Sequence, residues 1–121
     1  MTPKPIYETK FEDLKTSIYQ TNEALGMAAA EEAMDILQLA IGQKGEANAI
    51  IATGNSQLTF LKALRTMPVE WSKVNIFHMD EYIGLDPTHP ASFPLFLKLH
   101  LLDYIQPKCF RQNQSFESPF F

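Results

Sequence analysis

The chain has 121 residues, 45% of them hydrophobic and 20% charged, which is the composition of one folded domain and not of a disordered chain. Its formal net charge of -4 argues against nucleic acid or a membrane surface as a partner, and its single cysteine excludes an internal disulfide and a cysteine-rich zinc site. Residues 1–10 show no signal-peptide pattern and no run is apolar enough for a membrane span, so we expect a soluble, cytoplasmic protein.

The first strong structural signal comes after a weakly patterned N-terminal segment. Pro3 and Pro5 disfavour helix, so residues 1–9 are expected to be extended or loose, and residues 11–19 to hold a short strand or a turn of helix. Residues 22–41 predict a helix, because no proline interrupts them and their apolar residues recur at spacings of three and four. Such a face favours packing on a sheet over binding a partner helix. It consists of Met27, Ala30, Met34, Leu37 and Ile41.

A strand, a polar turn and a second helix are predicted next. Residues 47–52 are an apolar run of strand length, and residues 57–67 have a helical pattern that Asn55 or Ser56 is expected to cap. The polar turn between them, residues 53–56, aims backbone N–H groups and a positive helix end at an anion, although an ordinary turn without a ligand has the same pattern. The turn consists of Thr53, Gly54, Asn55 and Ser56.

The second strand, residues 74–77, leads directly into two adjacent carboxylates, Asp80 and Glu81. A loop over residues 84–94 and a helix over residues 93–104 follow. Carboxylates are rarely buried without partners, and ligands of open α/β sheets bind beyond the carboxyl ends of the strands. We therefore interpret the carboxylate pair as part of a site, with a turn-capping aspartate as the alternative.

The two strands are expected to be parallel, because their connection has the length of a βαβ crossover. The predicted fold class is α/β, with a Rossmann-like parallel sheet flanked by helices. The 53–56 turn and the carboxylate pair then lie at the same edge of the sheet. A backbone anion site beside a carboxylate suits a phosphorylated small substrate that undergoes proton transfer.

The histidines and the cysteine give no metal site. His78, His89 and His100 are scattered and form no pair at a spacing of four, so no metal ligation is predicted. His78 lies on the same side of the strand as Asp80, and it either orients the aspartate or is a buried histidine beneath the site.

Three motifs together resemble a known family. They are residues 52–56 (Ala-Thr-Gly-Asn-Ser), residues 78–85 (His-Met-Asp-Glu-Tyr-Ile-Gly-Leu) and residues 89–93 (His-Pro-Ala-Ser-Phe). Over about residues 22–108 the chain resembles glucosamine-6-phosphate deaminases, in the family that also contains the 6-phosphogluconolactonases. The lactonases tend to carry Asp-Glu-Arg where this chain has Asp-Glu-Tyr, so Tyr82 favours the deaminase branch.

The resemblance implies an activity and residue roles. The family converts glucosamine 6-phosphate and water to fructose 6-phosphate and ammonia without a cofactor, and an aspartate moves a proton between C2 and C1 of the opened sugar. By position, Asp80 would be that catalytic base, and Glu81 would support it or the neighbouring loop. A base for this step needs a carboxylate held still with a raised pKa, which an adjacent like charge promotes. The sugar-phosphate pocket would be lined by Thr53, Gly54, Asn55 and Ser56.

The chain also departs from the family pattern. Asn55 stands where Gly or Ser is usual and Gln57 where Pro is frequent, although Asn tolerates left-handed backbone. The family's second half, with an Asp-Gly-His segment, an Asn-Glu pair and basic phosphate-binding residues, has no counterpart here. We therefore expect residues 1–109 to be the N-terminal part of an incomplete domain, residues 110–121 to be a tail outside the family, and the chain to be a fragment from a truncated or frameshifted reading frame.

Two further functions stay open beside an aminosugar-phosphate deaminase. One is a 6-phosphogluconolactonase-like hydrolase, and the other is a non-catalytic sugar-phosphate-binding fragment or decayed gene product. In each enzymatic case the partner is a small-molecule sugar phosphate, and a homo-oligomer is left open.

Overall fold

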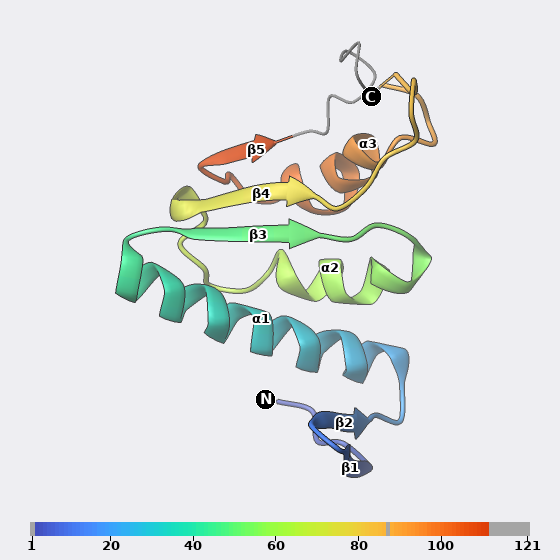
Figure 1. Ribbon diagram of the computed structural model, residues 1–121, viewed down its shortest axis with the longest axis vertical. Coiled ribbons are helices and arrows are strands. Elements are labelled where there is room, and N and C mark those ends of the chain that lie inside the picture. The colour runs from blue at the N-terminus through green and yellow to red at the C-terminus, as the bar shows by residue number, and fades with distance from the viewer. Residues whose placement is uncertain (1, 87, 112–121) are drawn as a thin grey trace.

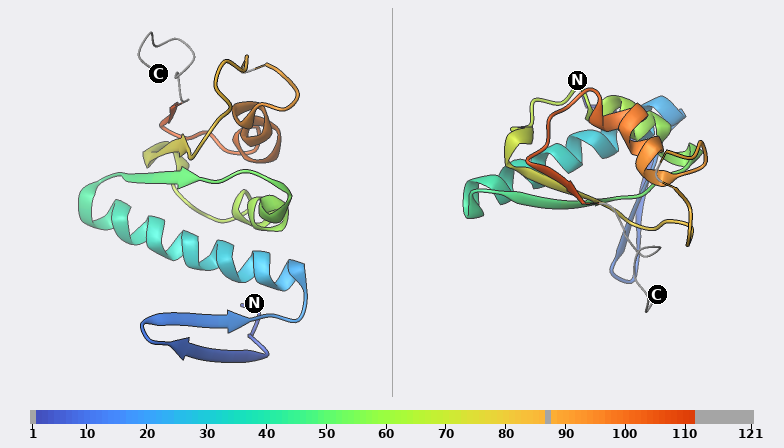
Figure 2. Two further views of the ribbon diagram at one scale, coloured as in Figure 1. Left: turned by 45° about the vertical axis from the view of Figure 1, so that its right-hand side comes forward. Right: turned by 90° about the horizontal axis from the view of Figure 1, so that it is seen from above.

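The computed structural model describes residues 2–86 and 88–111, which form an N-terminal hairpin and a three-stranded parallel sheet with helices on one of its faces (Figures 1 and 2). The strands are β1 (Tyr7–Phe11), β2 (Leu14–Ile18), β3 (Ala47–Ile51), β4 (Val74–His78) and β5 (Cys109–Arg111). The α-helices are α1 (Asn22–Lys44), α2 (Leu58–Leu64) and α3 (Phe93–Leu97). Two 3-10 segments, η1 (Asn55–Gln57) and η2 (Trp71–Lys73), and a π-helical segment, η3 (Lys98–Leu102), complete the elements.

The sheet has the order β3-β4-β5, and both of its strand pairs are parallel. The prediction of an α/β fold with a parallel sheet is therefore confirmed. Burial alternates along β4, because successive side chains of a strand point to opposite faces. Val74, Ile76 and His78 are buried on the helix-covered side, and Asn75 and Phe77 are half-buried on the other.

Helix α1 forms as the spacing of its apolar residues predicts. The Thr21 hydroxyl accepts a hydrogen bond from the Ala24 N–H at 3.0 Å, and Gly45 ends the helix in the left-handed conformation with φ of 81°. Ala30 and Leu37 are buried in the core, as expected. Gly26 lets α1 and α2 approach closely, since a Cβ at this position would lie 2.7 Å from Thr59.

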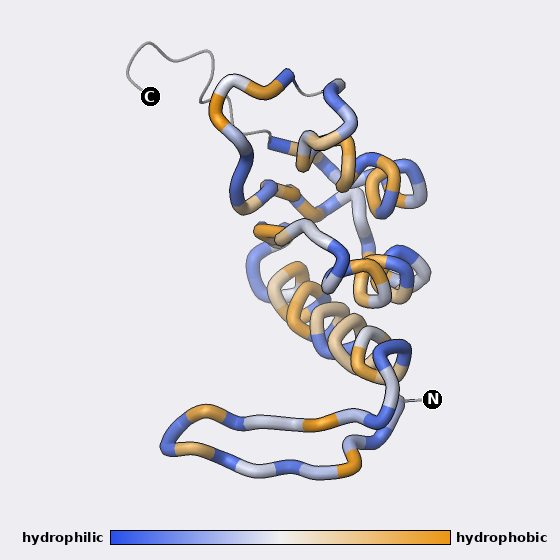
Figure 3. The backbone as a smooth tube through the Cα atoms, turned by 90° about the vertical axis from the view of Figure 1, so that its right-hand side faces the viewer, coloured by the Kyte–Doolittle hydropathy of each residue, from blue (hydrophilic) through white to orange (hydrophobic). Residues whose placement is uncertain are grey.

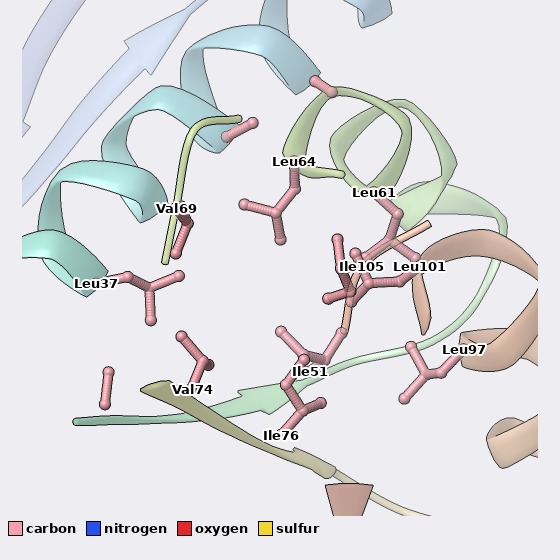
Figure 4. Close-up of a cluster of buried hydrophobic side chains, with 13 residues drawn as sticks. Leu37, Ile51, Leu61, Leu64, Val69, Val74, Ile76, Leu97, Leu101 and Ile105 are labelled. Carbon is pink, nitrogen blue, oxygen red and sulfur yellow. The ribbon is translucent and has the colours of Figure 1, made fainter. Parts of the chain in front are cut away.

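The hydrophobic core lies between the sheet and the helices (Figure 4). Each of its large fully buried side chains contributes roughly 1.5–3 kcal/mol relative to an exposed position. The same cluster also contains Leu97 of α3 and Leu101 of η3, so it packs β3 and β4 against all of these helices. The labelled members in the figure are Leu37, Ile51, Leu61, Leu64, Val69, Val74, Ile76, Leu97, Leu101 and Ile105.

The N-terminal segment is more regular than expected. β1 and β2 pair as an antiparallel hairpin, with Tyr7 opposite Ile18 and Phe11 opposite Leu14. The hairpin lies beyond α1 and extends away from the rest of the chain (Figure 3). Glu12 at its turn has φ of 52°, a left-handed conformation that is uncommon for a residue other than glycine, Asn or Asp. The turn contains no glycine, which would have indicated a hairpin. The sequence pattern therefore did not distinguish a strand from a helical turn over residues 11–19.

Two predicted helices differ from the structure. α2 is shorter than the predicted 57–67 helix, and neither Asn55 nor Ser56 caps it. The 3-10 segment η1 precedes it, and Gln57 holds the N-cap position without a side-chain capping bond. The predicted 93–104 helix is α-helical only as far as Leu97 and continues as η3. There the Arg65 guanidinium donates to the His100 carbonyl at 3.3 Å, a contact that competes with the regular α-helical ladder.

A third strand appears where none was predicted. Phe110 and Arg111, expected in a tail, belong to β5, which pairs with β4. The rest of the expected tail, residues 112–121, lies outside the described residues, and the domain boundary at residue 109 stays a prediction. Within residues 2–86 and 88–111, no helix combines the length and hydropathy that a membrane span requires.

Candidate active site

The two predicted turns meet at one edge of the sheet. Ile51 and His78 are register partners at the carboxyl ends of β3 and β4, and the Met79 N–H donates to the Ile51 carbonyl at 3.1 Å. Beyond this bond, β3 is followed by the 53–56 turn, and β4 is followed by Met79 and Asp80. The expectation that both turns share one edge is confirmed, because the strands are parallel and end at the same register position.

The turn after β3 depends on its glycine. Gly54 has φ of 117° and ψ of 167°, a backbone conformation essentially restricted to glycine. A Cβ at this position would meet no atom within 4 Å, so the glycine is needed for its dihedral angles and not for space. The Gln57 N–H donates to the Gly54 carbonyl at 3.0 Å and closes the turn, while Asn55 and Ser56 are exposed. The polar side chains that follow the glycine are therefore accessible at the edge.

Asp80 is exposed, and its main-chain carbonyl contacts the buried ring of His78. Its carbonyl lies 2.9 Å from Nδ1 of His78, a residue that is only 7% exposed. A carbonyl oxygen can only accept, so Nδ1 carries the hydrogen. The His78 ring also packs against Phe110 of β5 with a centroid distance of 6.0 Å. His78 is thus a buried histidine next to Asp80, as one alternative held, and its contact with the aspartate is to the main chain.

Glu81 is engaged with the neighbouring loop. Its carboxylate accepts from the Tyr82 N–H at 2.8 Å and from the Phe93 N–H at 3.2 Å. The Ser92 hydroxyl accepts from the Leu95 N–H at 3.1 Å, so two side chains satisfy the first turn of α3. Glu81 therefore joins the end of β4 to the start of α3 and closes the loop between them.

The two adjacent carboxylates thus have different surroundings. Asp80 is exposed at the edge, while Glu81 is half-buried and bonded to backbone N–H groups. Of the pair, Asp80 has the accessible position that a proton-transferring carboxylate requires, and Glu81 has the contacts of a loop anchor.

The loop between Tyr82 and Ser92 has its own internal contacts. The Tyr82 ring lies over the Phe93 ring at 5.2 Å between centroids. The Asp86 carboxylate accepts from the N–H and hydroxyl of Thr88, and these bonds lower the pKa of Asp86 below its usual value. Among the described residues, no three His, Cys, Asp or Glu side chains gather in a way that could hold a metal ion.

The sequence pattern missed two contacts of this site. The bond from Phe93 to Glu81 joins residues 12 positions apart, and the capping residue Ser92 was its only local signal. Phe110 contacts His78 from a strand that was not predicted, so no local pattern could have placed it there.

Comparison with known proteins identifies relatives of the chain. The family described as "Glucosamine-6-phosphate isomerases/6-phosphogluconolactonase" matches residues 20–118. A glucosamine-6-phosphate deaminase of Lactobacillus delbrueckii subsp. bulgaricus is 28% identical over 99 residues, which are 69% of this chain and 42% of the relative. One from Pseudoalteromonas translucida is 34% identical over 82 residues, 64% of this chain and 31% of the relative.

A solved structure shows the same fold. The crystal structure of a 6-phosphogluconolactonase from Shewanella baltica superposes with a TM-score of 0.70 at 26% identity, covering 79% of this chain and 42% of that protein. The chain therefore spans less than half the length of these relatives.

Proposed function

The chain belongs to the glucosamine-6-phosphate isomerase/6-phosphogluconolactonase family, and from this premise we propose that it contributes the proton-transfer edge of an aminosugar-phosphate deaminase. The proposed reaction converts glucosamine 6-phosphate and water to fructose 6-phosphate and ammonia. The observation that carries the proposal is the placement of an exposed carboxylate, Asp80, beside the glycine turn at the same edge of the sheet.

Asp80 is the proposed catalytic base. Its carboxylate takes a proton from C2 of the opened sugar and returns it to C1, so that one group serves both halves of the transfer. The bonds made by His78 and Glu81 on either side of it support this role, because a base that acts at a carbon must be held in position.

The turn after β3 is the proposed sugar-phosphate contact. Gly54 keeps the backbone open to an approaching group, and the exposed Asn55 and Ser56 offer an amide and a hydroxyl to the ligand. Thr53 precedes the glycine and completes the proposed binding segment. Glu81 supports the site by anchoring the loop instead of reacting.

A lactonase is the second candidate, because a structural relative is a 6-phosphogluconolactonase. Tyr82 in the Asp-Glu-Tyr segment favours the deaminase, since the resemblance places arginine there in lactonases. Both reactions use a sugar phosphate at the same edge of the sheet, and they differ in the bond that is broken.

Three assays on the purified chain separate the alternatives. Ammonia release from glucosamine 6-phosphate that disappears in Asp80→Asn and persists in Asp35→Asn, on the exposed side of α1, supports the deaminase. Acid release from 6-phosphogluconolactone without ammonia supports the lactonase. Calorimetric binding of glucosamine 6-phosphate without turnover supports the binding fragment, and the absence of any sugar-phosphate binding overturns the proposal.

A further inference from the structure

We propose that His78 is a positioning residue, which sets the place of Asp80 by donating its Nδ1–H to the Asp80 carbonyl. The inference rests on the proposed function in one respect, that Asp80 is the reacting group. Its physical basis is a bond from a buried ring to the main chain of an exposed residue, 2.9 Å long and spanning two positions of the chain.

The main chain of Asp80 lies where strand β4 no longer holds it. The bond from Met79 to Ile51 is made just after β4 ends, and the segment from Asp80 to Tyr82 has no regular secondary structure. A chain that leaves a sheet ordinarily gains freedom, since neighbouring strands no longer share its hydrogen bonds. The hydrogen bond from His78 holds the main chain at Asp80, the proposed reacting residue.

The ring of His78 is confined by its buried surroundings. It lies on the helix-covered side of β4, at the same face as Val74 and Ile76, which are fully buried. Phe110 of β5 packs against it. The ring belongs to β4, contacts β5 and is buried, so its hydrogen bond fixes the Asp80 carbonyl relative to the sheet.

A second fixed point follows immediately. The Glu81 carboxylate binds the N–H groups of Tyr82 and Phe93, so Asp80 lies between an anchor to β4 and an anchor to α3. Displacements near 1 Å at a reacting group cost on the order of 100-fold in rate, so such paired restraints matter for a carboxylate that moves a proton between two carbons.

The chemistry of the donor suggests a matched pair of variants. In His78→Asn the side-chain amide nitrogen occupies the same position along the side chain as Nδ1, so it keeps a donor for the carbonyl. In His78→Leu the side chain keeps a comparable buried volume and loses the donor. The two variants therefore separate the hydrogen bond from simple filling of space.

Nuclear magnetic resonance on the full chain tests the inference without requiring turnover. In the wild type, nitrogen shifts of the His78 ring should show a protonated Nδ1, and the amides of Asp80 and Glu81 should be as ordered on the picosecond scale as that of Ile76. His78→Asn should retain this order and His78→Leu should lose it, with the Ile76 amide unchanged. An unprotonated Nδ1, or equal order at Asp80 in a folded His78→Leu variant, overturns the proposal, and the ring measurement decides it even if that variant does not fold.

Kinetics add a second readout where ammonia is released. His78→Leu should lower kcat on the order of 10-fold to 100-fold with KM changed much less, and His78→Asn should restore most of kcat. Equal losses of kcat in both folded variants contradict the role of the donor. If the wild type releases no ammonia but the order at Asp80 depends on the donor, the proposed function fails while the positioning role of His78 stands.

Discussion

The two ends of the parallel sheet are built differently. At the amino end, the Lys108 ammonium lies 2.6 Å from the Glu46 carboxylate, and the Lys108 N–H donates to the Val74 carbonyl at 2.8 Å. These contacts join the starts of β3, β4 and β5. At the carboxyl end, the glycine turn and Asp80 leave their polar groups exposed. One end of the sheet joins the strands and the other leaves polar side chains exposed, so only changes at the carboxyl end should affect the proposed activity.

The largest expected effect is on activity at the carboxyl end. Asp80→Asn should reduce turnover by roughly 10²–10⁴-fold, because the amide cannot accept the transferred proton. The free energy of unfolding should change by less than about 0.5 kcal/mol, since the side chain is exposed. Ammonia release and urea denaturation measure the two quantities. Persistent turnover removes Asp80 from the mechanism, and a large loss of stability assigns it an architectural role.

The next effect tests the turn at the same end. Gly54→Ala should lower the free energy of unfolding by about 1–3 kcal/mol and weaken sugar-phosphate binding, because alanine is strained at φ of 117° and ψ of 167°. Gly42→Ala in α1 is the matched control, since no atom lies within 4 Å of its added Cβ. The control should gain up to about 1 kcal/mol from helix propensity. Chemical denaturation measures both, and equal effects at the two glycines would contradict the conformational argument.

A smaller effect is expected at the loop anchor. Glu81→Gln places an amide donor against one of the two N–H groups that the carboxylate now accepts, and should cost about 1–2 kcal/mol. The loss should be local, so hydrogen exchange should quicken at Tyr82 and Phe93 before it quickens at Ile76. Uniform exchange across these three amides would mean that Glu81 acts on the whole fold and not on the loop.

The smallest effect belongs to the amino end. The hydrogen bond and positive charge of Lys108 hold the pKa of Glu46 below its usual 4.5, and the same contact raises the pKa of Lys108 above 10.5. The Glu46 contribution is therefore present above its unfolded-state pKa and is lost as the pH falls through the lower folded-state pKa. The Lys108 contribution is present below its unfolded-state pKa and is lost as the pH rises through the higher folded-state pKa.

Urea denaturation of the wild type and Glu46→Gln tests this pair. Their difference in unfolding free energy should be small near neutral pH, because both side chains are about half exposed, and it should vanish in acid. A difference that grows as Glu46 becomes protonated would contradict the assigned sign. Turnover should be unaffected by this substitution, in contrast to Asp80→Asn at the other end.

Much of the fold, and the edge of the sheet at which the candidate site lies, could be predicted from local patterns. The spacing of apolar residues predicts α1, and two apolar runs followed by polar turns predict β3, β4 and their shared edge. Asp80 and Gly54 are placed by their positions directly after the strands. These features depend on short stretches of sequence, because the spacing of apolar residues differs between a helix and a strand.

The contacts that hold the candidate site together come from the packing of whole elements. The bond from Phe93 to Glu81 crosses a loop, and the bond to η3 comes from Arg65, just after the end of α2. Phe110 contacts His78 from β5. The surroundings of the two carboxylates differ for the same reason, since Glu81 accepts hydrogen bonds from backbone N–H groups that only the folded loop brings near it. Contacts between residues far apart in the chain depend on how whole elements pack, and no local periodicity records that.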